Sequence, residues 1–232
     1  MKNILWCGGS HLSNAKSKIN HWIDDHIFQH NADFYVTAGP KTLEWSANGG
    51  RYTIEGSIVS GSPYENDRKI DLLKYDLIIF IGQYIQPSRI LSKNTTWDDI
   101  FSKDLLNEYF KYGIIHPMRW NGHPAYNEPF ILFKELSNCN IIVLADPFPS
   151  SRDPQYFGTS IPMVKLYYES FVEFCNSIGL IPCFQPEPTI DNSIYTPAKF
   201  DRSFEDHLHK SLEFWELVFN VSLAHKFIEI FK

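Results

Sequence analysis

Short runs of apolar, often β-branched residues recur along this chain of 232 residues, and longer amphipathic stretches separate them. The clearest run, DLIIFI at residues 76–81, is apolar after its first position, as expected for a strand covered on both faces. We predict further strands at residues 3–7, 32–37, 140–145 and 180–184. Apolar residues at helical spacing predict helices at residues 14–28, 97–110, 161–177 and about 210–231. This alternation favours one α/β domain over residues 1–232, a three-layer α/β/α sandwich with a mostly parallel sheet.

Turn-forming residues indicate where some of these elements end. Gly179 is expected to end the preceding helix in the left-handed conformation. The Asn48-Gly49-Gly50 segment predicts a hairpin over residues 45–58, and residues 116–129 read as a long polar and aromatic loop.

Composition and charge exclude several classes of protein. The aromatic content of 16% supplies enough apolar surface for a packed core, and the net charge of −6 argues against a nucleic-acid partner. No window approaches the ~20 apolar residues of a membrane span, and the first residues lack a signal-peptide pattern. We therefore expect a cytoplasmic protein. The cysteines have no C-x-x-C spacing and are expected to stay reduced; they are Cys7, Cys139, Cys175 and Cys183.

Ser10 stands where a nucleophile would be useful in such a sheet. It follows the first predicted strand after Gly8-Gly9 and precedes a helix, and ligands of parallel sheets bind beyond the carboxyl ends of the strands. Amides at the helix start can stabilise negative charge on an attacked carbonyl oxygen. A helix-capping role is the alternative reading for an isolated serine.

A general base for Ser10 is suggested near the other end of the chain. Asp206 lies three residues before His209, so its carboxylate can accept from Nδ1–H and leave Nε2 free to take the serine proton. D-x-x-H by itself is also typical of a solvated capping turn. Its combination with Gly-Gly-Ser after the first strand is more informative than either pattern alone.

Together these patterns resemble the SGNH/GDSL hydrolase superfamily. Gly8-Gly9-Ser10-His11 is similar to its first block, Gly-Asp-Ser-Leu, and residues 206–209 match its last block, D-x-x-H. The segment IIVLADPFP at residues 141–149 resembles its proline-ended fourth strand. The resemblance implies a Ser10–His209–Asp206 catalytic triad. The chain departs from the family at Gly9 and His11, where the family has Asp and Leu.

The resemblance also implies an oxyanion hole, in which this chain departs further. Its third block, Gly-x-Asn-Asp, appears here as Gly82-Gln83-Tyr84-Ile85, so Gln83 or Tyr84 would donate in place of the asparagine. The backbone amide of Ser10 would be one donor. Gly61 is favoured over Gly56 for the second-block amide.

Further polar and aromatic residues are candidates for binding a hydroxyl-rich substrate. Besides His11, they come from the predicted loop and are His116, Trp120, Asn121 and His123, with a solvated surface loop as the alternative reading. No third ligand accompanies His207 and His209, so no metal is expected. Cys7 precedes the turn and is expected to be a small buried strand residue.

The leading hypothesis is a serine ester hydrolase or O-acyltransferase acting on an acylated, carbohydrate-type substrate, with coenzyme A as acyl donor if it is a transferase. SGNH-like proteins linked to bacterial polysaccharide synthesis have similarly loose motifs. One alternative is a catalytically inactive SGNH-like carbohydrate-binding protein. Another is a flavodoxin-like or nucleotide-binding protein, which would bind phosphate at Gly8–Ser10 and hold His209 far from Ser10. The apolar C-terminal helix offers a possible homodimer face.

Overall fold

The computed structural model describes most of the two ends of the chain and less of its middle. The described residues are 2–25, 30–36, 44–48, 51–55, 69–82, 104–105, 128–152, 161–191, 195–206 and 209–231. The predicted helix at 97–110 falls almost entirely outside these ranges, as does most of the predicted loop at 116–129.

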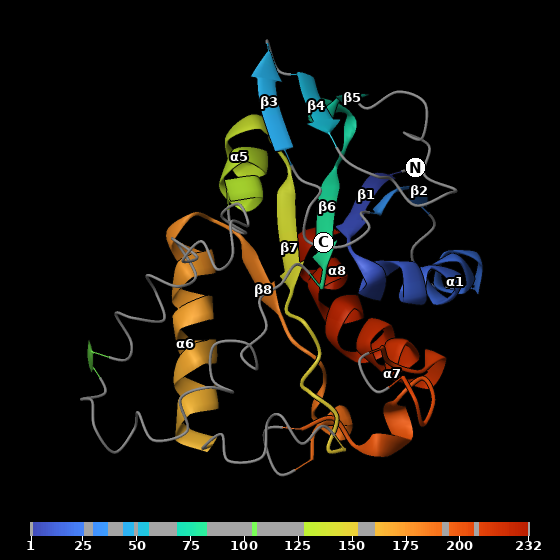
Figure 1. Cartoon of the computed structure of the whole chain (residues 1–232). Coiled ribbons are helices and arrows are strands. Elements are labelled where there is room, and N and C mark those ends of the chain that lie inside the picture. Colours follow the sequence, from blue (N-terminus) through green and yellow to red (C-terminus); the bar gives the residue numbers. More distant parts are fainter. Residues whose placement is uncertain are drawn as a thin grey trace.

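A five-stranded parallel sheet in the order β2-β1-β6-β7-β8 forms the centre of the molecule (Figure 1). Its strands are β1 (Lys2–Gly8), β2 (His30–Val36), β6 (Leu77–Ile81), β7 (Asn140–Leu144) and β8 (Ile181–Cys183). All five predicted strands are confirmed, with ends shifted by one or two residues. Because β1 lies between β2 and the central strand β6, its carboxyl end lies inside the sheet rather than at an outer strand.

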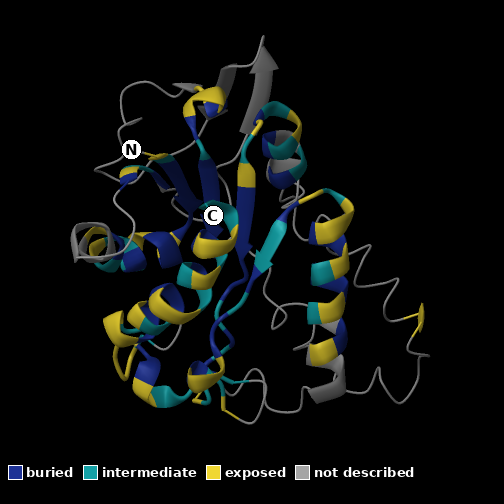
Figure 2. Ribbon diagram, turned by 180° about the vertical axis from the view of Figure 1, so that it is seen from behind, coloured by how far each residue is buried: buried dark blue, intermediate teal, exposed yellow. Residues whose placement is uncertain are grey.

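Helices cover both faces of this sheet. One layer contains α5 (Glu128–Leu136) and α6 (Ile161–Ser177); the other contains α1 (Ser10–Asp25), α7 (Leu212–Leu217), the π-helical turn η6 (Val218–Leu223) and α8 (Ala224–Phe231). Leu5 and Cys7 of β1 pack into the first layer, and Ile4 and Trp6 pack into the second. The strands are buried and the helices expose their outer faces (Figure 2). The predicted three-layer α/β/α sandwich is confirmed.

The smaller elements flank this sandwich. A three-stranded antiparallel sheet contains β3 (Glu44–Asn48), β4 (Arg51–Glu55) and β5 (Lys69–Ile70), which confirms the predicted hairpin. Within the described ranges lie three short 3₁₀ turns, η1 (Leu72–Lys74), η4 (Glu187–Thr189) and η5 (Ala198–Phe200). Gly179 has φ 71°, which confirms its predicted left-handed conformation after α6.

Several predicted helix boundaries were wrong. Helix α1 begins at Ser10 rather than 14, because Leu12 and Ala15 already pack into the core. The C-terminal helix begins at Leu212 rather than about 210, because Lys210 pairs with Asp201 in an isolated bridge and Ser211 accepts from the backbone N–H of Phe214 as its N-cap.

Three further features bear on the sequence predictions. The region read as a loop ends two residues early, since Glu128 and Pro129 begin α5, where proline suits the first turn. All four cysteines are free, and Cys7 is buried with the pKa of its thiol raised by that burial, as expected of a structural strand residue. Among the described residues, no helix has the length and apolarity that crossing a bilayer requires.

Candidate functional site

The turn between β1 and α1 places Ser10 just beyond the carboxyl end of β1, beside the central strand β6. Ser10 is exposed and is the first residue of α1, whose first turn is closed by a hydrogen bond from the Ser13 N–H to the Gly9 carbonyl, 3.1 Å. A Cβ on Gly8 would collide with the carbonyl oxygen of Ile81 in the neighbouring strand. Glycine at position 8 therefore lets the first helix start directly against the end of β6.

Gly82, at the end of β6, allows a second close approach in the same place. Its φ is 64°, and a Cβ there would lie 2.7 Å from the Cβ of His11 and 2.8 Å from Oδ1 of Asp146. Both the backbone conformation and the lack of space require glycine. The ends of β1, β6 and β7 consequently meet around the side chain of His11.

The loop from Asp201 to Lys210 carries the second group of polar residues. Asp201 and Lys210 form an isolated antiparallel bridge, and inside it the Arg202 N–H donates to the carbonyl of His209 at 2.9 Å. Within the loop, the Asp206 N–H donates to Oγ of Ser203 at 3.0 Å. These bonds join residues 201–202 to residues 209–210 and connect Ser203 with Asp206.

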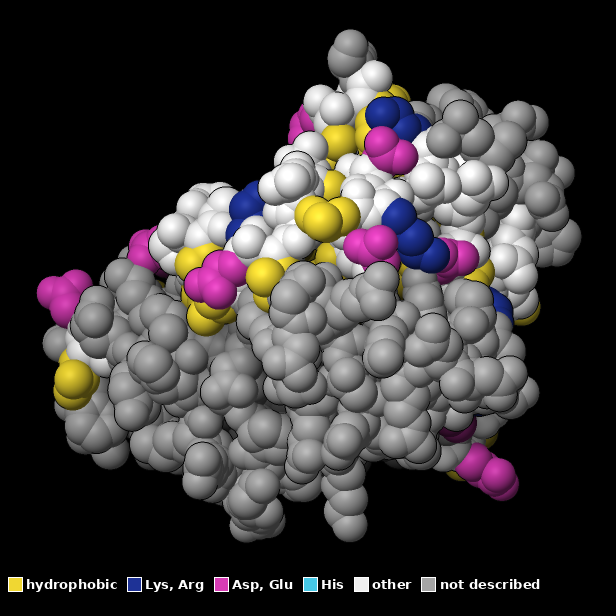
Figure 3. Space-filling view, turned by 90° about the horizontal axis from the view of Figure 1, so that it is seen from above, with side chains coloured by type: hydrophobic (Ala, Val, Ile, Leu, Met, Phe, Trp, Pro, Cys, Tyr) yellow, Lys and Arg dark blue, Asp and Glu magenta, His cyan; other side chains and the backbone are white. Residues whose placement is uncertain are grey.

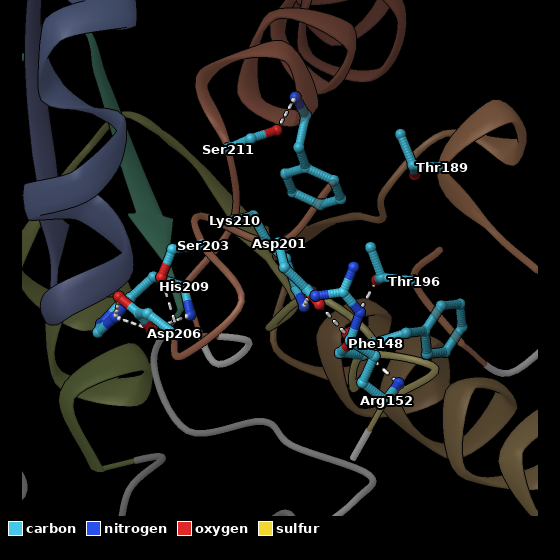
Figure 4. Close-up of polar contacts among 12 residues, drawn as sticks. Phe148, Arg152, Thr189, Thr196, Asp201, Ser203, Asp206, His209, Lys210 and Ser211 are labelled. Atoms are coloured by element: carbon cyan, nitrogen blue, oxygen red, sulfur yellow. Dashed lines mark hydrogen bonds and ion pairs between the residues drawn. The ribbon is translucent and has the colours of Figure 1, made fainter. Parts of the chain in front are cut away.

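Asp206 and His209 form the pair that the D-x-x-H spacing predicts. The Nδ1 atom of His209 lies 2.9 Å and 3.0 Å from the two carboxylate oxygens of Asp206, and the backbone N–H of His209 donates to the same carboxylate at 3.1 Å (Figure 4). With Nδ1–H donating to an ionised carboxylate, Nε2 carries the imidazole lone pair. The pair is therefore arranged to accept a proton at Nε2.

The surroundings of Asp206 keep its carboxylate ionised. Its partial burial alone would raise the pKa, but the two hydrogen bonds and the charge of His209, assisted by Arg202 at 3.6 Å, hold the pKa of Asp206 below its ordinary value. An ionised Asp206 stabilises the imidazolium that forms when His209 accepts a proton.

Helix α1 and the loop carrying His209 meet at the carboxyl edge, although they lie near opposite ends of the sequence. The rings of His11 and His209 are in edge contact, with centroids 5.6 Å apart and planes at 62°. Helices α1 and α7 are also joined, since Nε1 of Trp215 in α7 donates to Oδ1 of Asn14 in α1 at 2.7 Å. Figure 4 shows Asp206 and His209 beside α1. The residue next to Ser10 in the sequence thus contacts the imidazole of His209.

His11 occupies a buried position within this group. It is 5% exposed, its ring lies 6.2 Å from that of Trp215, and its Nε2 is 3.9 Å from Oδ1 of Asp146. Burial, followed by the positive charges of His209 and Lys210, lowers the pKa of His11 from 6.5 to about 3, so the ring is neutral. Its predicted contact with substrate is limited to the small exposed part of the residue.

Two buried charged groups were missed from the sequence. Lys210 and Asp201 form an ion pair at 3.2 Å with both side chains 1% exposed, and Ser150 Oγ donates to the same carboxylate at 2.6 Å. In Figure 4 this pair lies on the other side of the loop from His209. Asp146 could have been selected as a site residue, because it directly follows the predicted strand at residues 140–145. No sequence pattern links residues 201 and 210.

The remaining predicted site residues lie outside the described residues. These are Gly61, Gln83 and Tyr84 of the proposed oxyanion hole and His116, Trp120, Asn121 and His123 of the proposed substrate loop. In the described ranges, no three His, Cys, Asp or Glu side chains are grouped as metal ligands would be.

Comparison with known proteins identifies the fold. No protein-family model matches the sequence, and no curated protein matches it significantly. Among solved structures, one assigned as an acylhydrolase from Bacteroides fragilis superposes with a TM-score of 0.51 at 9% identity, over 98% of this chain and 86% of that one.

Two other solved structures match nearly the whole chain. One is the periplasmic domain of a Salmonella lipopolysaccharide acetyltransferase (TM-score 0.48, 13% identity, 98% of this chain and 84% of that one). The other is an extracellular lipase from Streptomyces rimosus (TM-score 0.48, 11% identity, 95% and 99%). At these identities the likeness concerns the fold. The chain therefore shares the α/β fold of the Bacteroides fragilis acylhydrolase, which is the kind of fold that the resemblance seen in its sequence implied.

Proposed function

We propose that this protein is a serine-dependent ester hydrolase or O-acyltransferase with Ser10 as nucleophile, His209 as general base and Asp206 as the carboxylate that orients the base. The observation that carries the proposal is the Asp206–His209 hydrogen-bonded pair, held in ring contact with the residue that follows Ser10. The fold shared with acylhydrolases supports the same chemistry by analogy.

Each reaction step uses a group at the carboxyl edge of the sheet. Ser10 Oγ attacks the acyl carbonyl carbon while its proton passes to Nε2 of His209, and Asp206 stabilises the resulting imidazolium. The negative charge on the carbonyl oxygen is stabilised by the backbone N–H of Ser10, with Gly61 and Gln83 or Tyr84 as further proposed donors. The bond from the acyl carbon to the leaving group then breaks, C–O in an ester or C–S in a coenzyme A thioester. His209 returns the proton to the departing oxygen or sulfur, leaving Ser10 acylated.

The second half of the reaction decides between the two activities. His209 removes a proton from water or from a substrate hydroxyl, whose oxygen attacks the acyl-serine carbonyl, and the ester bond to Ser10 breaks as the proton returns to Oγ. Water gives a hydrolase. A sugar hydroxyl gives an O-acyltransferase, with coenzyme A thioester as the proposed donor. We propose a carbohydrate acceptor from the predicted loop residues His116, Trp120, Asn121 and His123.

Steady-state hydrolysis of p-nitrophenyl acetate tests the nucleophile, with two matched serine variants. Ser10→Ala should lower kcat by on the order of 10³-fold or more, whereas Ser13→Ala, an exposed serine later in the same helix, should stay within about twofold of the wild type. Equal turnover by Ser10→Ala and wild type would exclude Ser10 as nucleophile. A wild-type protein that turns over no ester or acyl-coenzyme A would favour the non-catalytic binding protein.

A further inference from the structure

The side chain of His11 occupies a position in this site that neither the triad nor its oxyanion hole uses. The SGNH first block that this segment resembles has Leu there, whereas this chain buries an imidazole, which costs more to desolvate than an alkyl group. Nδ1 of His11 is buried and makes no hydrogen bond within the described part of the chain. A buried polar ring next to a proposed base needs a physical explanation.

The geometry around His209 suggests what the ring of His11 does. The hydrogen bond from Nδ1 of His209 to Asp206 fixes one edge of the imidazole, and the bond from the His209 backbone N–H holds the same carboxylate in place. The plane of the imidazole can still tilt about the Nδ1···carboxylate direction. An aromatic ring in edge contact, with centroids 5.6 Å apart, opposes that tilt. Two contacts in different directions thus determine where Nε2 points.

The surroundings of His11 hold its own ring in place. The ring lies against Trp215 on one helix, near Asp146 after β7 and next to Gly82 after β6, where no larger residue fits. Asp146 Oδ1, 3.9 Å from Nε2 of His11, gives an attractive field for an N–H on that nitrogen. Three separate elements therefore restrict the ring that contacts His209.

We propose that His11 is a positioning residue, whose buried ring, seated by Asp146, Trp215 and Gly82, fixes the orientation of the His209 imidazole towards Ser10. This inference rests on the proposed function and adds a residue to it. The ring acts in its neutral form, since a second positive charge at this place would oppose the imidazolium that His209 forms during the reaction.

Three variants test the proposal by kinetics. His11→Ala should lower kcat for p-nitrophenyl acetate by about 10- to 100-fold with KM within about twofold, because the substrate still binds but Nε2 is misdirected. His11→Phe restores a neutral ring and should recover kcat to within about threefold of wild type. Ile19→Ala, a buried residue elsewhere on α1, destabilises the same helix and should leave kcat unchanged.

A spectroscopic readout separates this inference from the proposed function. The downfield proton resonance of the hydrogen bond between His209 and Asp206 should be sharp in wild type and in the Ile19→Ala and His11→Phe variants, and weakened or lost in His11→Ala. If wild type lacks activity but the resonance follows this pattern, the positioning role stands and the function is wrong. Full kcat and an unchanged resonance in a folded His11→Ala variant, or a His11→Phe variant as impaired as His11→Ala, would overturn the proposal.

Discussion

The two ends of the parallel sheet carry similar residue types but use them differently. At the amino end, Asp76 accepts from the backbone N–H of Asn3 at 2.8 Å and from Lys2 at 3.2 Å, and Asp33 accepts from Tyr75 at 2.7 Å and from Lys74 at 2.9 Å. Figure 3, which views this end of the molecule, shows described acidic and basic side chains beside each other. These ion pairs lie near the amino ends of the strands, and their side chains are partly exposed to solvent.

At the carboxyl end, charged and polar side chains are buried. His11 is 5% exposed and 3.9 Å from a buried carboxylate, and Lys210 with Asp201 forms an ion pair away from water. Burying such groups lowers stability unless something compensates for it. Charged residues at the amino end therefore form pairs that contact solvent, whereas those at the carboxyl end are buried at a cost in stability, as is common for polar groups at functional sites.

The largest expected contrast concerns the two partly exposed aspartates. Asp206→Asn should lower kcat by on the order of 10³- to 10⁴-fold, because an amide no longer holds His209 in the right tautomer or stabilises its imidazolium. Asp76→Asn should leave kcat unchanged. Ester hydrolysis by the two variants measures this contrast, and a comparable loss in both would mean that the ends do not differ in function.

The next largest effect is expected at the buried ion pair. Lys210→Met removes the cation of the ion pair and leaves the buried carboxylate of Asp201 with the hydrogen bond from Ser150 Oγ. This should lower the free energy of unfolding by about 3–5 kcal/mol. Lys2→Met removes an exposed partner of Asp76 and should cost less than about 1 kcal/mol. Urea denaturation of the two variants gives both values; equal losses would contradict the assignment of burial.

Acid should destabilise the two ends in different pH ranges. The folded pKa of His11 is about 3 against an ordinary 6.5, so below pH 6.5 the unfolded chain binds a proton that the folded chain does not. Stability from this site is therefore lost at about 1.4 kcal/mol per pH unit as the pH falls from 6.5 towards 3. Among the described residues, the charged or titratable groups near the ring are His209, Lys210, Asp206 and Asp146.

Comparing His11→Phe with wild type isolates this acid sensitivity. Between pH 7.5 and pH 4.5 the variant should gain about 3 kcal/mol relative to wild type, since it has no proton to take up on unfolding. At the amino end, hydrogen bonding by Asn3 and pairing with Lys2 lower the folded pKa of Asp76, so its stabilisation is present above the ordinary value of 3.8 and lost only as the pH falls below it. A constant difference between variant and wild type over this range would show that His11 titrates normally.

A smaller effect is expected from the glycine that admits His11 and Asp146. Gly82→Ala places a Cβ 2.7–2.8 Å from both and requires a left-handed alanine, which should cost about 2 kcal/mol and reduce kcat by shifting His11. Gly179 follows α6 and has a φ of 71°, so Gly179→Ala should have a similar backbone cost. Its Cβ would lie 3.3 Å from Lys134, a looser contact, and kcat should not change. Equal kcat values in the two variants would show that Gly82 is not needed to position His11.

Much of the fold followed from the sequence because strands and helices have different periods. The β-branched runs of β6 and β7, buried on both faces, could be read directly, and α6 was predicted with its observed ends. The start of α1 was misplaced by four residues, because helical periodicity says little about the first turn after a strand. The C-terminal helix is apolar around much of its circumference, so its sequence pattern does not show where the π-helical turn η6 lies.

The site divides in the same way. The Asp206–His209 pair is local, so its spacing alone predicted the hydrogen bond that forms. The contact of His11 with His209 and the pairing of Asp201 with Lys210 depend on how distant segments pack, and no pattern in one sequence encodes them. His11 was consequently expected to contact substrate, and its buried position beside the base emerges only from the fold.

Labelling with a fluorophosphonate probes the joint action of Ser10 and His209, because the reagent reacts with a serine that an adjacent base has activated. We expect one phosphonyl group per chain, located by peptide mass spectrometry on Ser10, with labelling slowed strongly in His209→Gln and unchanged in Ser13→Ala. Labelling of another serine, or equal rates of Ser10 labelling in wild type and His209→Gln, would contradict a hydroxyl from the start of the chain and an imidazole from near its end acting together.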